Sequence, residues 1–203
     1  MTETSATDFL KLMANRRSVP AKALVDPAPD EATLHQLVCA AASAPDHGGL
    51  VPWRCLQIRG QARDALGALF VDALRRRQPE APEALIARER EKPLRAPLLV
   101  GLVCSPVPDH PKIPVWEQQA TAATVGGYLL LAAEAAGFGG VWLSGERCSD
   151  PYVCRGLGLA EHEQLLGFLN LGTPSARPSP RRRPAPQDVL GDWHGPPGGD
   201  NAP

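Results

Sequence analysis

The stretch Trp116-EQQATAATVGGYLLLAAEA-Ala136 predicts one long helix. Residues 120–133 within it carry no charge and are apolar on nearly every side of the helix. Such a helix has no polar face for water, so it lies in the centre of a fold or in an interface. Gly137 follows it and is a natural residue to end a helix. We therefore expect the other elements to be arranged around this helix.

Helical and strand patterns alternate through the rest of the chain. The run Pro97-LLVGLV-Cys104 is continuously apolar, which is typical of a strand covered on both faces. Thr7 and Asp30 are expected to cap two helices, the first ending near Asn15 and the second before Pro45. Further strands are expected at 53–59, 140–143 and 164–171, and further helices at 62–77, at 82–91 and from residue 151. This alternation predicts an α+β or α/β domain with one central sheet.

The C-terminal segment differs in composition from the rest of the 203-residue chain. Residues 174–203 hold eight of the 22 prolines, four glycines and the run Arg181-Arg182-Arg183. This composition buries too little apolar surface to offset the entropy lost on ordering. We predict one compact domain over 1–173, followed by an extended arm or a disordered, solvated tail over 174–203. Val189, Leu190 and Trp193 are the large apolar groups that would pin such an arm to the body or to a partner.

Composition argues against several classes of function. The chain has 21 Lys and Arg against 22 Asp and Glu, and the resulting net charge of -1 disfavours nucleic-acid binding, which usually needs a strongly basic face. No run of 18 uncharged apolar residues predicts a membrane span, and no signal peptide is visible. The five cysteines form no C-x-x-C pair, so we expect no zinc site and reduced thiols in the cytoplasm.

Familiar catalytic motifs are missing from the sequence. The chain has neither a G-x-x-x-x-G-K-[ST] phosphate loop nor an H-E-x-x-H metal motif. Ser144-Gly145 lacks the first glycine of a nucleophile elbow, and Gly156-Leu-Gly158 lacks the third glycine of a dinucleotide fingerprint. Hydrolase and metal-dependent mechanisms therefore have little support.

Three segments remain as candidate ligand sites. Arg16-Arg17-Ser18 offers two guanidiniums and a hydroxyl that suit a phosphate, although an arginine pair at a helix end is also an ordinary surface feature. Ala44-Pro45-Asp46-His47 leads into Val51-Pro52-Trp53-Arg54, and taken alone it is a surface loop. The glycines of Gly137-FGGVWLS-Gly145 let a backbone approach a flat ligand, or they make a tight turn into a core strand.

The order and separation of these segments resemble the nitroreductase superfamily. Lys112-IPVWE-Gln118 and Gly167-FLNLGT-Pro174 are also similar to its small single-domain branch, so the resemblance covers about Phe9 to Pro174. The resemblance implies an α+β sandwich in which helices wrap a central mixed sheet. It also implies a homodimer that holds two FMN molecules at its interface, where the long helix would be buried.

The resemblance assigns candidate cofactor-binding residues. Arg16, Arg17 and Ser18 match the motif that holds the phosphate and ribityl chain of FMN. The other candidates are Ser43, Pro45, Asp46 and His47, in the segment that reaches the flavin from the other subunit, and Trp142, Leu143 and Ser144, at the strand end that lines the flavin. No metal ligand or catalytic side chain is implied, because the flavin carries the chemistry. Lys22 is our candidate for a cation that tunes the flavin potential.

Three positions depart from the family pattern. Leu143 stands where a relative has a basic residue, and Val51 stands where many members have a glutamine that bonds the flavin ring. Ala21 occupies another position that is basic in a relative, and Lys22 comes one step late. Phosphate anchoring is therefore expected to be intact, while polar contacts to the ring are expected to be fewer. The resemblance also offers the Arg181–Arg183 run as a group that reaches a phosphate, although a solvated tail is the expected state.

The implied activity is a ping-pong cycle. NAD(P)H passes hydride to N5 of FMN and leaves, and a nitro compound or quinone then takes its place and is reduced. An FMN-dependent oxidase or dehalogenase and a non-enzymatic flavin-binding protein remain as alternatives. Rapid flavin bleaching by NADH or NADPH would favour the reductase, very slow bleaching the oxidase or dehalogenase, and an absence of FMN affinity the non-enzymatic protein.

Overall fold

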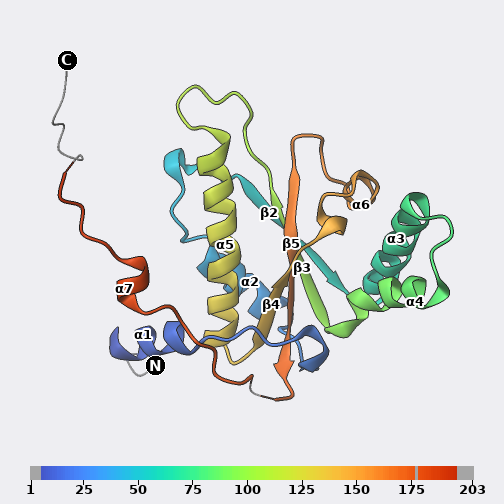
Figure 1. Ribbon diagram of the computed structural model, residues 1–203, viewed down its shortest axis with the longest axis horizontal. Coiled ribbons are helices and arrows are strands. Elements are labelled where there is room, and N and C mark those ends of the chain that lie inside the picture. The colour runs from blue at the N-terminus through green and yellow to red at the C-terminus, as the bar shows by residue number, and fades with distance from the viewer. Residues whose placement is uncertain (1–5, 177, 196–203) are drawn as a thin grey trace.

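A five-stranded sheet with β5 at its centre organises the molecule (Figure 1). The computed structural model describes residues 6–176 and 178–195, without the side chains of residues 6 and 7. The strands are β1 (Leu24–Val25), β2 (Trp53–Arg59), β3 (Leu98–Cys104), β4 (Gly139–Leu143) and β5 (Gln164–Pro174). β5 pairs with β1, β3 and β4, and β2 pairs with β3.

The α+β fold is confirmed, but the sheet differs from the mixed sheet that we expected. All four strand pairings are antiparallel. Parallel pairing among the described residues is confined to one bridge between Ser18 and Gly140. The chain leaves the edge of β4 directly after this bridge and turns into a 3₁₀-helix at Ala21, so no parallel strand develops.

Helices cover both faces of this sheet. They are α1 (Ala6–Asn15), α2 (Glu31–Ala41), α3 (Gln61–Arg77), α4 (Glu83–Glu91), α5 (Val115–Ala135), α6 (Pro151–Gly156) and α7 (Pro186–Val189), with 3₁₀-helices η1 (Ala21–Ala23), η2 (His47–Gly49), η3 (Lys92–Arg95) and η4 (Glu146–Cys148). Neighbouring residues of a strand point to opposite faces. Leu98, Val100 and Leu102 of β3 therefore pack in the same core as α2 and α5, whereas Leu99 and Val103 pack with α3 and α6. Every residue of β3 is buried, as its apolar run predicted.

Most predicted elements lie within a few residues of the observed ones. Asp30 caps α2, because its Oδ1 accepts the N–H of Thr33 at 2.8 Å. The short strand β1, the last three residues of β5 and helix α7 were not expected. The side chain of Thr7, the other expected cap, and residues 177 and 196–203 of the C-terminal segment lie outside the described residues.

The described residues contain neither a helix that could span a membrane nor a group of side chains that could hold a metal ion. None of their helices is both long and apolar enough to cross a membrane. The same residues contain no group of three or more His, Cys, Asp and Glu side chains that could hold a metal ion.

The indole of Trp142 is seated on two glycines between β4 and α5. A β-carbon added at Gly126 of α5 would lie 2.5 Å from the Trp142 ring, and one added at Gly167 of β5 would collide with the indole nitrogen. Nε1 of Trp142 donates to the backbone oxygen of Leu166 at 3.0 Å. The missing side chains therefore allow the helix and the central strand to approach the ring closely.

An ion pair between the part-buried Arg54 and the buried carboxylate of Glu163 fastens the loop before β5 to β2. Arg54 donates from Nε and Nη2 to the two carboxylate oxygens of Glu163, at 2.7 and 2.6 Å. The side chain of Glu163 is 6% exposed, and it also accepts the N–H of Ala160 at 2.9 Å. Hydrogen bonding from Arg54 is the main reason that the pKa of Glu163 falls to about 2.

Gly126→Ala should lower the free energy of unfolding by about 1–3 kcal/mol, because the added methyl group overpacks the Trp142 ring. This loss outweighs the helix propensity that alanine gains over glycine, about 1 kcal/mol. Gly101→Ala is the matched control, since a β-carbon there comes no closer than 3.3 Å to its nearest neighbour, Leu56. Urea denaturation of both variants tests the account, and an equal or larger loss for Gly101→Ala would contradict it.

The Arg54–Glu163 pair should make stability depend on pH in acid. The pKa of Glu163 is depressed from its ordinary value of 4.5 to about 2, so its stabilisation is present above pH 4.5 and is lost as the pH falls toward 2. Glu163→Gln should cost about 2–3 kcal/mol at pH 7. Denaturant titrations should show this difference from the wild type shrinking toward pH 3, whereas exposed Glu161→Gln should show little difference at either pH. A difference for Glu163→Gln that stays constant with pH would refute the assignment.

Candidate functional site

The segment after α1 lies beside β4. Ser18 forms a parallel bridge with Gly140, and the N–H of Val19 donates to the Gly140 oxygen at 3.1 Å. α1 ends at residue 15, so the half-buried Arg16 and Arg17 follow it directly. The fold therefore brings together two of the three segments that the sequence singled out.

The guanidiniums of Arg17 and Arg183 meet at the backbone oxygen of Arg16, and the Arg16 guanidinium belongs to the same segment. Arg17 donates from Nη1 to the backbone oxygens of Ala14 and Arg16, both at 2.9 Å. Arg183 donates from Nη2 to the same Arg16 oxygen at 2.7 Å. None of these three guanidiniums has a carboxylate partner in the part of the chain that the structure describes. Cations gathered without a counter-ion suit an anion with several oxygens, such as a phosphate monoester.

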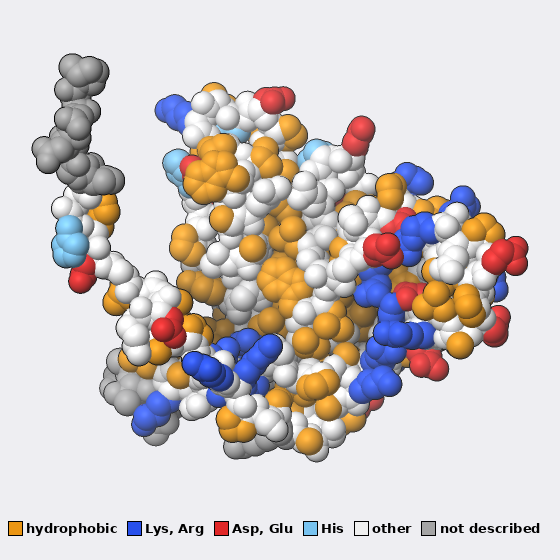
Figure 2. All heavy atoms as spheres, in the orientation of Figure 1, with side chains coloured by type: hydrophobic (Ala, Val, Ile, Leu, Met, Phe, Trp, Pro, Cys, Tyr) orange, Lys and Arg blue, Asp and Glu red, His pale blue; other side chains and the backbone are white. Residues whose placement is uncertain are grey.

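The C-terminal arm crosses α1 and carries Arg183 to this group (Figure 1). Figure 2 shows Lys and Arg side chains gathered where the arm passes the helix. We expected a solvated tail, and the contact of Arg183 with Arg16 instead agrees with the alternative, in which the Arg181–Arg183 run reaches the phosphate-binding segment. The apolar residues of the arm do not pin it to its own body, because Val189, Leu190 and Trp193 are 72%, 75% and 83% exposed.

The segment with Ser43, Pro45 and His47 lies against the first two turns of α5. Thr121 of α5 donates its hydroxyl hydrogen to the Pro45 oxygen at 3.0 Å. Nδ1 of His47 lies 2.8 Å from a carboxylate oxygen of Glu117. The exposed hydroxyl of Ser43 donates to a backbone oxygen of α2 at 2.8 Å. The loop is therefore fixed to two helices while its outer side stays open.

The same loop contains three residues with positive φ, of which Val51 is strained because it carries a side chain. Gly48, Gly49 and Val51 have φ angles of 74°, 62° and 49°. A β-branched residue seldom adopts positive φ, and Val51 is held there partly because its N–H donates to the Asp46 carboxylate at 2.8 Å. Strain of this kind clusters at ligand-binding sites. The strain coincides with Val51, which was one of the departures noted in the sequence.

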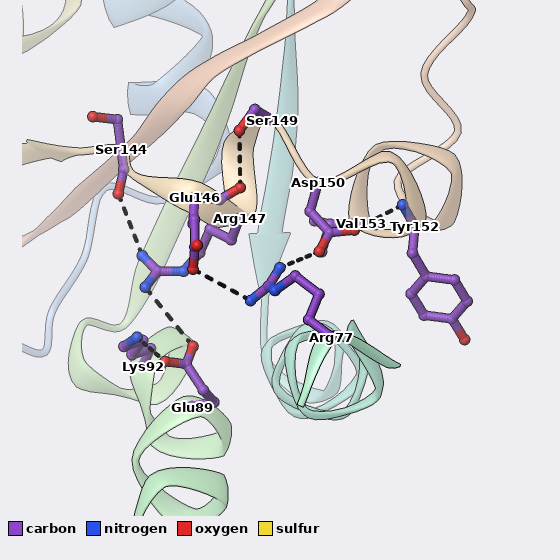
Figure 3. A network of polar contacts seen from close by, with 10 residues as sticks. All are labelled: Arg77, Glu89, Lys92, Ser144, Glu146, Arg147, Ser149, Asp150, Tyr152 and Val153. Atoms are coloured by element: carbon purple, nitrogen blue, oxygen red, sulfur yellow. Dashed lines mark hydrogen bonds and ion pairs between the residues drawn. The ribbon is translucent and has the colours of Figure 1, made fainter. Parts of the chain in front are cut away.

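At the end of β4, the backbone and the residues Leu143 and Ser144 are exposed. Trp142 turns its indole into the body of the protein, so its side chain is used in packing. Leu143 is 41% exposed and Ser144 is exposed. The backbone oxygen of Ser144 accepts from Nη1 of Arg147 at 3.4 Å (Figure 3). A flat ligand over this strand end would therefore meet backbone atoms and Leu143.

The two groups of candidate residues lie near opposite ends of α5 (Figure 1). Gly140, which is bridged to Ser18, lies against Leu130, whereas His47 contacts Glu117. The 13 residues between these points of α5 correspond to about 20 Å along the helix. A single chain therefore does not bring both groups to one small ligand.

The face of α5 that is turned away from the sheet is apolar and exposed. Trp116 is 67% exposed and Tyr128 is 38% exposed, and small exposed residues follow at helical spacing between them (Ala120, Ala123 and Gly127). The opposite face buries Val125, Leu129 and Ala133. From the sequence we expected this helix to lie either in the centre of the fold or in an interface. One face of α5 is buried in the core, and the other face is suited to an interface.

Sequence reasoning missed several residues around these segments. Glu117 and Thr121 hold the 43–47 loop, but they lie 70 or more residues from their partners along the chain. Glu117 belongs to the 112–118 segment that carried the resemblance, but no role was assigned to it. Arg147 follows the glycine-rich segment closely, but its contact with Ser144 depends on the 3₁₀-helix η4, which we did not predict from the sequence. Lys22 is exposed on η1, near the first segment in sequence.

Residues 13–173 match the family model described as "Nitroreductase family". The chain is 36% identical over 172 residues to the protein named "Putative NAD(P)H nitroreductase YdjA" of Escherichia coli (strain K12), and the match covers 85% of this chain and 91% of that protein.

Two solved structures have a similar fold. A nitroreductase-like family protein from Bacillus cereus is 24% identical, with a TM-score of 0.79 and coverage of 96% of this chain and 99% of the other. A point mutant of the FMN- and NADPH-dependent nitroreductase NfnB from sphigopyxis sp. strain HMH is 23% identical, with a TM-score of 0.68 and coverage of 92% and 99%.

Proposed function

The chain belongs to the nitroreductase family, and we propose that it is an FMN-dependent enzyme that uses NAD(P)H to reduce nitro compounds or quinones. The family and the named relative support an oxidoreductase. The cofactor, the ping-pong order of its steps and a cytoplasmic location are parts of our proposal. A similar fold in an FMN- and NADPH-dependent nitroreductase is consistent with it.

The observation that carries the proposal is that the Arg17 and Arg183 guanidiniums meet at the backbone oxygen of Arg16, and that none of these three arginines pairs with a carboxylate of the described residues. These residues would hold the phosphate of FMN through charge-assisted hydrogen bonds. Ser18 would add a hydroxyl beside them, and the β4 end at Leu143 and Ser144 would supply a wall for the flavin ring. The donor set therefore fits the cofactor, and Lys22 stays our candidate for tuning its potential.

FMN, when bound, supplies hydride transfer between the nicotinamide and the electron acceptor. The protein binds, orients and shields the reactants. The arginines would fix one end of the cofactor, and the exposed end of β4 at Leu143 and Ser144 would lie against its ring. We propose that residues 1–173 form this FMN-binding domain and that 174–203 form an arm which contributes Arg183.

A second copy of the chain would complete each site. The 43–47 loop and the Arg16–Ser18 segment lie near opposite ends of α5, so we propose that the two groups which meet one cofactor come from different chains. The exposed apolar face of α5 gives two copies a surface to bury. Ser43, Pro45, Asp46 and His47 of one copy would then close over the flavin of the other.

Arg16→Gln should weaken FMN binding about 10- to 100-fold, because it removes charge-assisted hydrogen bonds to the phosphate. The Arg16 guanidinium has no hydrogen bond or ion pair within the described residues, so the fold should be unaffected. Riboflavin lacks the phosphate and should bind both proteins equally in fluorescence titrations. Arg75→Gln, the same change on an exposed part of α3, is the control. Unchanged FMN affinity in Arg16→Gln would contradict the assignment.

Ala123→Arg on the exposed face of α5 should give a monomer that no longer retains FMN. The introduced charge would have to be buried without a partner where two copies meet. Ala65→Arg on the exposed side of α3 is the matched control and should remain a dimer. Sedimentation velocity and flavin content, measured on the same samples, test the prediction. A dimeric, FMN-loaded Ala123→Arg protein would rule out this face as the interface.

A further inference from the structure

Two small adjoining cavities lie between the sheet and the α3–α4 pair. Each has a volume of about 80 Å³, and they share Phe70, Lys92 and Arg147 in their walls. The cavity nearer the sheet is also lined by Arg95 and by Leu143 at the end of β4. Figure 2 shows a band of Lys and Arg side chains in this part of the molecule.

The charges around the cavities do not balance. Arg77 is paired with both Glu146 and Asp150 (Figure 3). Glu89 is shared, because Lys92 contacts one of its oxygens and Arg147 lies 3.8 Å from the other. Arg95 has neither a hydrogen bond nor an ion pair within residues 6–176 and 178–195. Four cations therefore face three carboxylates, and the surplus positive charge is at Arg95.

Buried nitrogen atoms in this group also lack partners. The Nε atoms of Arg95 and Arg147 are buried and form no hydrogen bond. Arg147 is partly compensated, since its guanidinium lies 5.3 Å from the centre of the Phe70 ring. Burial lowers the pKa of Lys92, and its repulsion from Arg147 acts in the same direction, although Glu89 opposes both. A buried donor without an acceptor destabilises the unliganded fold, and an anion would relieve that cost.

The walls select the kind of anion. Apart from Lys92, Arg95 and Arg147, the cavity wall is mainly apolar and also contains the polar side chain of Asn170; its apolar residues are Phe70, Pro93, Leu99, Leu143 and Phe168. A single surplus charge matches a monoanion better than a phosphate dianion. A carboxylate attached to an aromatic ring combines one negative charge with an apolar body.

We propose that the Arg95 cavity binds the carboxylate of an aromatic acid and thereby selects carboxylated electron acceptors. Leu143 lines this cavity, and Arg147 contacts Ser144, so the site adjoins the strand end to which we assign the flavin. The description of the ligand as an electron acceptor rests on the proposed function. The anion site itself rests only on the charges, the cavity and the unpartnered nitrogens.

Isothermal titration calorimetry with benzoate tests the site on the purified full-length protein, with its flavin content recorded. Benzoate should bind at least tenfold more tightly than neutral benzyl alcohol. Arg95→Met should weaken benzoate binding about 10- to 100-fold and leave benzyl alcohol unchanged. Arg95→Lys should restore most of the affinity. Arg59→Met, which removes a part-buried guanidinium elsewhere, should behave as the wild type.

Thermal unfolding separates binding from a structural role. Without ligand, Arg95→Met should unfold at a higher temperature than the wild type, because it removes an uncompensated buried cation. Benzoate should raise the unfolding temperature of the wild type and leave that of Arg95→Met unchanged. A destabilised Arg95→Met protein that binds benzoate normally would overturn the proposal, as would inorganic phosphate that binds more tightly than benzoate.

Kinetics connect the site to electron acceptors. In the FMN-loaded enzyme, Arg95→Met should lower kcat/KM for 4-nitrobenzoate at least tenfold, mainly through KM, and should leave 4-nitrobenzyl alcohol unaffected. An equal loss of kcat/KM for both compounds would overturn the proposal that this site selects carboxylated acceptors. A protein that holds no FMN but binds benzoate through Arg95 would refute the proposed function while supporting the anion site.

Discussion

The fold depends on a helix that has almost no polar face. α5 buries one side against the sheet and leaves Trp116, Tyr128 and a row of small residues exposed on the other. Exposure of an apolar helix face to water is unfavourable, so we expect a partner surface to cover the face of α5 that is turned away from the sheet. The same helix separates the 43–47 loop from the segment after α1. Association of two copies would therefore bury the helix and complete the ligand sites in one step.

β4 lies between two groups of cations. At its start, Gly140 is bridged to Ser18, next to the arginines that meet at the Arg16 oxygen. Beyond its end, Ser144 is contacted by Arg147, which belongs to the group around Arg95. Trp142 anchors the strand between these points, because its ring fills the space left by two glycines. The strand thus offers a flat surface with a positive group at each end, which suits a phosphorylated cofactor and an anionic substrate.

The sequence predicted the parts of the fold that local patterns determine. The apolar run of β3, the Asp30 cap and the long helix follow from periodicity and cap chemistry within a few residues of chain. β1 was missed because a two-residue strand exists only through its pairing with the end of β5. The antiparallel character of the sheet likewise depends on how distant strands pair.

The site was predictable as a set of segments rather than as a set of contacts. Arg16, Arg17 and Ser18 were identified together with the glycine-rich segment, and the fold places the two side by side. The direction of the Trp142 indole could not be inferred, because it is set by glycines 16 and 25 residues away. The contact of Arg183 and the group around Arg95 each join segments that are about 50 residues or more apart in the chain. A local sequence pattern does not predict which distant segments meet.

The central claim is that two chains build two identical flavin sites, and native mass spectrometry of the purified protein tests it most directly. The account predicts one dominant species that contains two chains and two FMN molecules, and loss of the flavin when the chains are separated. A single chain that retains one FMN would contradict it, because Arg16 and His47 would then have to serve one cofactor from opposite ends of α5.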